Sequence, residues 1–79
     1  MTQAQERQVR QVIADVLNIP VDHVKPELSP QEADGWDSVQ HLNLVLAIEE
    51  AMGIQLAPEE IEGMQSVGDI LRIVQQKAK

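Results

Sequence analysis

The chain has 79 residues, a net charge of −7 and no cysteine, and this length suits one small domain that buries about 60% of its extended surface. The missing thiols exclude a disulfide framework, a thiolate zinc site and a cysteine nucleophile. Between Lys25 and Arg72 the sequence has ten acidic and no basic side chains. Such a field repels nucleic-acid phosphates and attracts a basic protein partner, although acidic residues also simply maintain solubility.

The sequence also indicates where the protein works. Its N-terminal residues lack the apolar core of a secretion signal, and no apolar run is long enough to span a bilayer. The absence of cysteine is typical of a reducing compartment. We therefore expect a single domain over residues 1–79 that is soluble, cytoplasmic and monomeric, without membrane or nucleic-acid binding. His23 and His41 lack the carboxylate spacing of a metal site, so we expect no metal and a solvent-exposed His41.

The first predicted helix covers residues 2–18. Its apolar positions recur at spacings of three and four, which is the pattern of one buried helical face. These positions are Val9, Val12, Ile13, Val16 and Leu17. Thr2 and Gln5 have the spacing of a capping box at the start, and Pro20 prevents the helix from continuing.

A long connection is predicted over residues 21–36, because Pro26, Pro30 and Gly35 interrupt any regular pattern. Three of its apolar residues are expected to insert into the core, namely Val21, Val24 and Leu28. A loop of this length is uncommon in a small domain and is often functional. Trp36, the only aromatic residue, is expected to pack over the loop and the edge of the core.

The second predicted helix begins after Asp37, which is a good N-cap, and ends before Gly53. Its apolar residues are Val39, Leu42, Leu44, Val45, Leu46, Ile48 and Met52. At about 100° per residue they cover an arc of roughly 220°, which is wider than one packing face needs. We therefore expect this helix to lie near the centre of the domain, flanked on two sides, with Leu46 buried.

Two more helices complete the predicted fold. Pro58 begins a short acidic helix that ends near Gly63, with Ile61 facing inward. Ser66 caps the last helix, whose apolar stripe suits the core and whose basic end suits the helix dipole. The stripe is Val67, Ile70, Leu71 and Val74, and the basic residues are Lys77 and Lys79. The chain is therefore predicted to be all-α, a four-helix bundle with three main helices, one short third helix and a long first loop.

Ser38 stands in the first turn of the second predicted helix, next to the Asp37 carboxylate and at the mouth of an apolar groove. No base lies beside it in the sequence, so its hydroxyl is placed for covalent attachment by another enzyme rather than for nucleophilic attack. The sequence also lacks a nucleophile–base pair, a metal cluster and a glycine-rich phosphate loop. These absences argue against an enzyme.

The order of these features resembles the acyl carrier proteins, which form the phosphopantetheine-attachment family. The resemblance covers essentially the whole chain. It comprises the long first helix and loop, Asp37-Ser38-Val39 opening the second helix, Glu49-Glu50 near its end, the short acidic third helix, and Ser66-Val67 opening the last.

The resemblance implies a prosthetic arm on Ser38. A separate phosphopantetheinyl transferase would attach 4′-phosphopantetheine from coenzyme A with Mg²⁺, and Asp37 would support the transfer. The arm would carry fatty, polyketide or aminoacyl intermediates as thioesters and present them to acyl-loading and acyl-transfer enzymes with basic docking patches. The implied partner surface is Val39, Leu42, Leu46, Glu49 and Glu50. The implied acyl groove is Leu42, Leu46, Leu56, Ile61, Met64 and Ile70.

Several residues depart from the pattern of the family. Val39 replaces the usual Leu or Met after the serine, Gly35-Trp36 replaces the usual pair before the motif, and Gln40 and Asn43 replace acidic residues. These changes favour a free-standing, specialised carrier over a role in fatty-acid synthesis. The alternative is a non-enzymatic acidic helical adaptor in which Ser38 stays unmodified.

Overall fold

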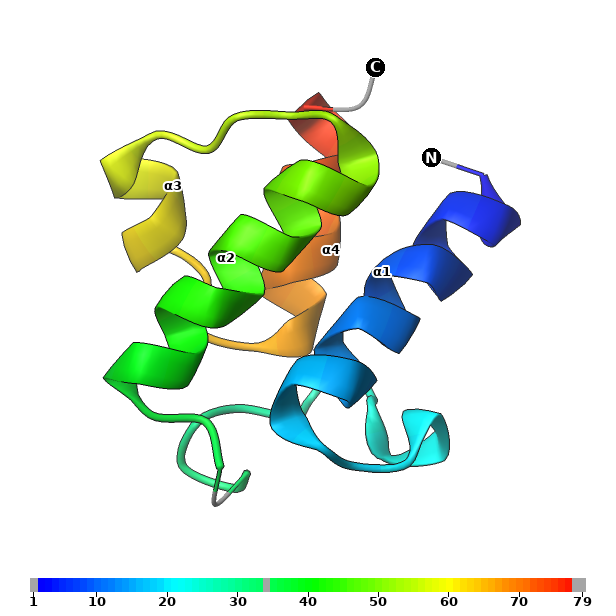
Figure 1. The fold of residues 1–79 in the computed structure, drawn as a ribbon, viewed down its shortest axis with the longest axis vertical. Coiled ribbons are helices and arrows are strands. Elements are labelled where there is room, and N and C mark those ends of the chain that lie inside the picture. Colours follow the sequence, from blue (N-terminus) through cyan, green and yellow to red (C-terminus); the bar gives the residue numbers. More distant parts are fainter. Residues whose placement is uncertain (1, 34, 78–79) are drawn as a thin grey trace.

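The protein is all-helical in its computed structural model, which describes residues 2–33 and 35–77. The elements are α1 (Gln3–Leu17), a 3₁₀ turn η1 (Val21–His23), α2 (Ser38–Met52), α3 (Pro58–Glu62) and α4 (Val67–Lys77) (Figure 1). The predicted all-α class, with three main helices and a short third one, is confirmed. No helix in the described ranges has both the length and the apolar character needed to cross a membrane.

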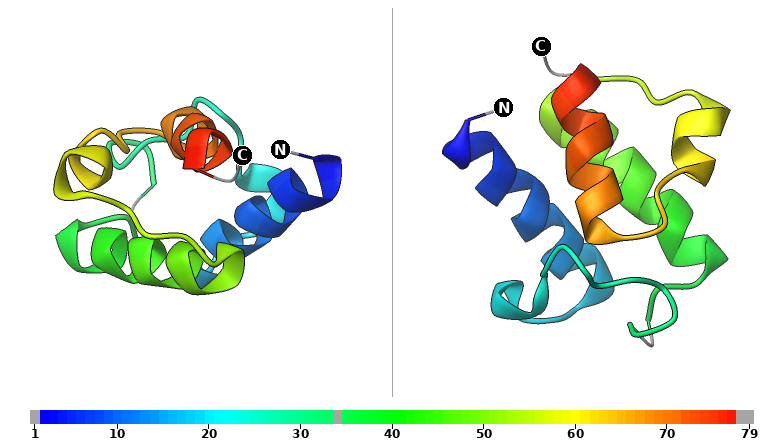
Figure 2. Two further views of the ribbon diagram at one scale, coloured as in Figure 1. Left: turned by 90° about the horizontal axis from the view of Figure 1, so that it is seen from above. Right: turned by 180° about the vertical axis from the view of Figure 1, so that it is seen from behind.

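The helices surround one core. Seen from above, α2 lies on one side of the molecule and α4 on the opposite side, while α1 and α3 lie at the two ends between them (Figure 2). The chain runs from α1 to α2 through the long loop beneath the core, and from α2 to α3 over its top (Figure 1). This arrangement places the start of α2 beside the long loop and the connection between α3 and α4.

Local sequence signals set the helix ends where they were predicted. The Thr2 hydroxyl accepts from the amide of Gln5 at 3.1 Å, and the Gln5 side chain accepts from the amide of Thr2 at 2.9 Å, which completes a capping box. Gly53 ends α2 with a φ of 65°, a left-handed conformation that favours glycine. Ser66 caps α4 by accepting from the amide of Asp69 at 3.2 Å.

The core draws on every helix except α3, together with the loops. The residues at most 7% exposed include Val9, Ile13, Leu17, Val24, Trp36, Leu44, Val45, Ile48, Leu56, Met64, Val67, Ile70, Ile73 and Val74. Val24 therefore inserts from the long loop as predicted, while Val21 and Leu28 are half-buried and pack against the core. Trp36, which is predicted at the edge of the core, is itself buried. Ile73 is a core residue that the predicted stripe omits.

The long loop is held by hydrogen bonds from α1 and from α4. Arg10 of α1 donates from Nε and Nη2 to the carbonyl of Val24, at 3.1 Å and 2.9 Å. The first amides of α4, those of Val67 and Gly68, donate to loop carbonyls at 2.9 Å each. These amides have no partner within their own helix, so the loop satisfies them while it is itself fixed.

The predicted burial of α2 on two sides is wrong. Val39 is 67% exposed, Leu42 57% and Leu46 63%, and the buried residues of α2 are Leu44, Val45 and Ile48. The reason is that α1 and α4 cover one side of α2, whereas α3 has five residues and is too short to cover the other. A stripe of large apolar side chains on α2 consequently faces solvent.

Candidate functional site

Ser38 is the first residue of α2 and is exposed to solvent. Asp37 precedes it in extended conformation, and its Oδ1 accepts from the amide of Gln40 at 2.9 Å. This contact satisfies one of the unpaired amides at the helix start. The predicted N-cap is therefore confirmed, and it leaves the neighbouring serine on the outer surface of the first turn.

A pocket of about 600 Å³ adjoins Ser38. Three segments line it: the long loop, the first turns of α2, and the connection from α3 to α4. Its lining residues are Pro30, Gln31, Trp36, Asp37, Ser38, His41, Leu42, Met64 and Gln65. We call this the Ser38 pocket. Its volume lies in the range of sites that hold small ligands, and its wall mixes apolar and polar side chains.

A hydrogen-bond bridge stands at the wall of the Ser38 pocket. The indole Nε1 of Trp36 donates to Nδ1 of His41 at 3.0 Å, and Nε2 of His41 lies 3.0 Å from the carbonyl oxygen of Ile61. Because an indole nitrogen only donates, Nδ1 must accept; the hydrogen is then on Nε2, which donates to Ile61. The two rings are stacked with centroids 6.1 Å apart. The Trp36–His41–Ile61 bridge thus joins the loop, α2 and α3.

The expectation of a solvent-exposed His41 is wrong. His41 is half-buried and uses both ring nitrogens within the protein. It lies one helical turn after Ser38, and this spacing is the only signal by which the sequence could have placed it in the Ser38 pocket. Gln31 and Gln65 also line the pocket, and no pattern in the sequence distinguishes them from other surface glutamines.

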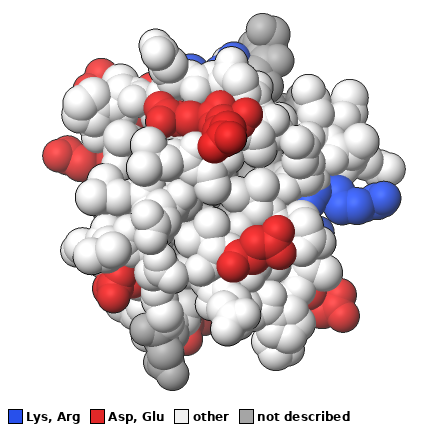
Figure 3. Space-filling view, in the orientation of Figure 1, with Lys and Arg blue, Asp and Glu red and all other residues white. Residues whose placement is uncertain are grey.

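The residues predicted as a partner surface lie on the outer side of α2, but their environments differ. Val39, Leu42 and Leu46 are more than half exposed. Glu50 is exposed, whereas Glu49 is half-buried and its Oε2 accepts from the amide of Leu56 at 2.8 Å. Figure 3 shows acidic side chains at separate points on the face that carries α2, with basic side chains only toward its edges.

The six residues predicted to form an acyl groove do not lie together in one groove. Leu42 and Met64 line the Ser38 pocket. Leu46 and Leu56 line a separate depression beside the end of α2. Ile70 is fully buried in the core, and Ile61 is half-buried with its carbonyl oxygen bound to His41. The groove residues are therefore divided between two surface depressions and the core.

No metal centre is formed within residues 2–33 and 35–77, because no three His, Asp or Glu side chains converge there. Three of the carboxylates accept hydrogen bonds from backbone amides, and two, those of Asp69 and Glu60, form ion pairs with Arg72 and Lys77. Asp37, Glu49 and Glu60 each accept from one amide at 2.8–2.9 Å. These carboxylates have structural partners already.

Comparison with known families decides what kind of domain this is. The model of a family described as "Phosphopantetheine attachment site" matches residues 7–74. The chain belongs to this family. Domains of the phosphopantetheine-attachment family carry 4′-phosphopantetheine covalently and do not themselves catalyse a reaction. The role of this carrier domain is therefore to hold a prosthetic group.

The residues around Ser38 are suited to such a group. The Ser38 hydroxyl is exposed and accessible to a modifying enzyme. It lies at the N-terminus of a helix of fifteen residues, where the helix dipole favours a negatively charged phosphodiester. The Ser38 pocket gives space beside it, with the Gln31 and Gln65 amides as hydrogen-bonding groups and Trp36 and Leu42 as apolar contacts.

Proposed function

We propose that this carrier domain is an acyl carrier protein in which Ser38 bears the 4′-phosphopantetheine arm. The observation that carries the proposal is the exposed Ser38 hydroxyl, which opens α2 beside the Ser38 pocket and lies within the matched range 7–74. The arm supplies a terminal thiol, which holds an acyl group as a thioester. The cysteine-free chain has no thiol of its own for that purpose.

The chain's own residues have three tasks in this proposal. Ser38 provides the oxygen of the phosphodiester, and the start of α2 stabilises its negative charge. Asp37 holds the first turn of the helix in shape and presents a carboxylate next to the serine during the transfer. The compact fold acts as a soluble tether that raises the effective concentration of the attached group at each partner enzyme.

Intact mass spectrometry tests this assignment. We expect that incubation with coenzyme A, Mg²⁺ and a phosphopantetheinyl transferase adds one phosphopantetheine to the parent chain and none to Ser38→Ala. Ser29→Ala is the matched control, because Ser29 lies in the long loop and outside the Ser38 pocket, and it should be modified like the parent. A parent that gains no mass with several active transferases would contradict the proposal, as would a modified Ser38→Ala.

We further propose that partner enzymes dock on the outer side of α2. Val39, Leu42 and Leu46 are large apolar side chains spaced by three and four residues, and all are exposed. An exposed apolar stripe of this kind is typical of a protein-binding surface. Glu50 adds negative charge near its far end, so a partner with a basic patch around an apolar centre would match it.

Association kinetics test this surface. Glu50→Lys should slow association with the transferase at low salt, and the difference should shrink as salt screens the charges. Glu6→Lys is the control, since Glu6 is an exposed acid on α1, away from the stripe. Equal association rates for the two variants would exclude the proposed role of Glu50.

The proposal extends to the pathway that the carrier serves and to the cargo that it carries. The carrier serves a polyketide, aminoacyl or other dedicated pathway in the cytoplasm. The departures at Trp36, Val39, Gln40 and Asn43 support this over general fatty-acid synthesis. Intact mass of the protein isolated from its own host would show the arm and its cargo together, and a long saturated acyl chain as the main cargo would contradict the specialised role.

A further inference from the structure

The residues on either side of α3 are packed into the core. Leu56 and Met64, which lie before and after α3, are 7% and 2% exposed, and Ile70 behind them is fully buried. The buried polar side-chain atoms of the described residues all have partners. An apolar chain entering here would have to displace side chains that are already packed.

The Trp36–His41–Ile61 bridge links α2 to α3. His41 comes from α2 and the carbonyl of Ile61 from α3, with a separation of 3.0 Å between Nε2 and the oxygen. Parting the two helices breaks this bond and leaves a carbonyl and a ring nitrogen to be desolvated by an apolar chain. Burying unpaired polar groups against hydrocarbon is unfavourable. The bridge therefore opposes insertion of hydrocarbon between α2 and α3.

The Ser38 pocket, in contrast, is open and already adjoins the proposed attachment point. The amides of Gln31 and Gln65 offer donors and acceptors, and Trp36 and Leu42 offer apolar contact. Amides and short acyl groups can bind in this pocket, since its wall presents hydrogen-bonding groups close to a limited apolar area. A long hydrocarbon chain would leave much of its surface in contact with water there, because more than half of the residues that line the pocket are polar.

We propose that this carrier presents short or polar acyl cargo at its surface in the Ser38 pocket, and that the Trp36–His41–Ile61 bridge excludes long apolar chains from the space between α2 and α3. The inference rests on the proposed attachment at Ser38 and names the class of cargo. It also assigns His41 a positioning role: the ring holds α3 against α2 and does not react.

The test compares an acetyl and an octanoyl group, each loaded as its acyl-phosphopantetheine onto the parent chain. The first readout is the rate at which hydroxylamine cleaves the thioester. The second is the set of backbone amide chemical shifts of the core residues Leu44, Ile48 and Ile70. A chain hidden for most of the time would be cleaved about tenfold more slowly than an exposed one. We expect the cleavage rates of the acetyl and octanoyl thioesters to agree within about twofold. We also expect the core amides to have the same chemical shifts with either cargo.

His41→Ala tests the bridge, with His23→Ala as the matched control because His23 is exposed in η1 and lies outside the pocket. We expect octanoyl cleavage to slow several-fold in His41→Ala, with shifted core amides, and to be unchanged in His23→Ala. Should His41→Ala fail to fold, Trp36→Phe removes the indole donor while keeping an aromatic ring, and a smaller change in the same direction is expected.

Two results would overturn the inference. Protection of the octanoyl thioester in the parent, with shifted core amides, would show that the chain enters the core despite the bridge. Unchanged octanoyl cleavage in the folded His41→Ala variant would show that the bridge is not the barrier. A parent that accepts no arm at all would instead overturn the attachment at Ser38, so failure of the two proposals is distinguishable.

Discussion

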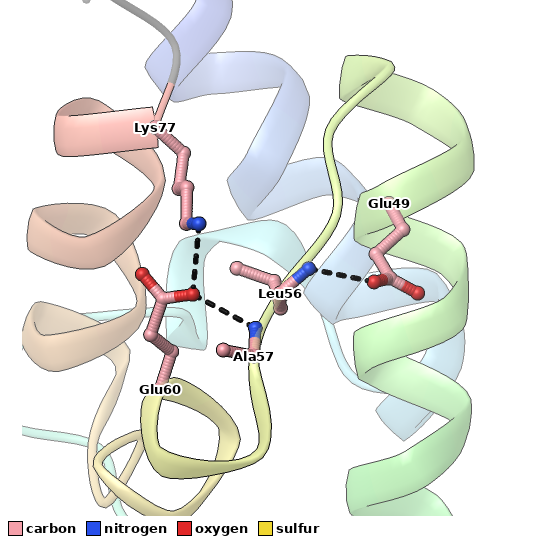
Figure 4. Close-up of polar contacts among 5 residues, drawn as sticks. All are labelled: Glu49, Leu56, Ala57, Glu60 and Lys77. Atoms are coloured by element: carbon pink, nitrogen blue, oxygen red, sulfur yellow. Dashed lines mark hydrogen bonds and ion pairs between the residues drawn. The ribbon is translucent and has the colours of Figure 1, made fainter.

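Glu49 and Glu60, which belong to two different helices, accept hydrogen bonds from two successive backbone amides. The amide of Leu56 donates to Glu49 and that of Ala57 donates to Glu60, both at 2.8 Å (Figure 4). The same oxygen of Glu60 lies 3.0 Å from Nζ of Lys77 at the end of α4. The connection from α2 to α3 is thus fixed to α2 on one side and, through this ion pair, to α4 on the other.

We predict that Glu49 contributes more to stability than Glu50 does. Glu49→Ala removes the acceptor of a part-buried amide, and loss of such a charge-assisted bond costs about 1–3 kcal/mol. Glu50→Ala is the matched control, because it lies in the same last turn of α2 but is exposed; its effect should stay within about 0.5 kcal/mol. Urea unfolding of the two variants measures the difference, and equal midpoints would contradict a structural role for Glu49.

We predict that Glu60 makes stability depend on pH in the acid range. The hydrogen bond from the amide of Ala57, followed by the bond and charge of Lys77, lowers the pKa of Glu60 below its ordinary value of 4.5. The unfolded chain therefore takes up this proton at a higher pH than the folded one. The contribution is fully present above about pH 4.5 and is lost as pH falls through the lowered pKa.

Thermal unfolding at a series of pH values checks this expectation. Glu60→Gln should be less stable than the parent near neutral pH, and the difference should narrow below about pH 4.5. Glu62→Gln serves as the control, since Glu62 is an exposed acid of the same short helix. A difference between parent and Glu60→Gln that is constant with pH would exclude this titration.

We predict that two neighbouring apolar residues of α2 differ sharply in their effect on folding. Ile48→Ala should lower the free energy of unfolding by about 2–5 kcal/mol, because Ile48 is fully buried. Leu46→Ala should change it by only about 0.5 kcal/mol, because Leu46 is 63% exposed. Chemical denaturation of the two variants measures both changes in the free energy of unfolding. A large loss in Leu46→Ala would mean that this side of α2 is covered after all.

We predict that Asp37 has separable roles in capping and in transfer. Asparagine caps a helix about as well as aspartate, whereas alanine costs about 1 kcal/mol. Asp37→Asn should therefore unfold like the parent and Asp37→Ala at lower denaturant. Both variants lack the carboxylate and should receive phosphopantetheine more slowly. If Asp37→Asn is modified at the parental rate, the carboxylate acts only as a cap.

Much of the fold follows from local patterns in the sequence. Thr2, Asp37 and Ser66 are caps in the structure as they are in the prediction, and Gly53 ends α2. These signals are reliable because a cap joins residues only three or four positions apart, so its chemistry is complete within one turn. The resemblance to a phosphopantetheine-attachment domain also rests on such local order, and the family match over residues 7–74 agrees with it.

What the sequence by itself determined is therefore the set of helices, their ends and the family, because each depends on short-range patterns. The tertiary structure alone decided which side of α2 is covered, since that depends on the length and placement of α3. It alone placed His41 within hydrogen-bond distance of Ile61, which lies twenty positions further along the chain. It also paired Lys77 with Glu60 of α3, whereas the sequence predicts only an interaction of Lys77 with the dipole of α4. Contacts between distant residues arise from packing, and no periodicity in the sequence encodes them.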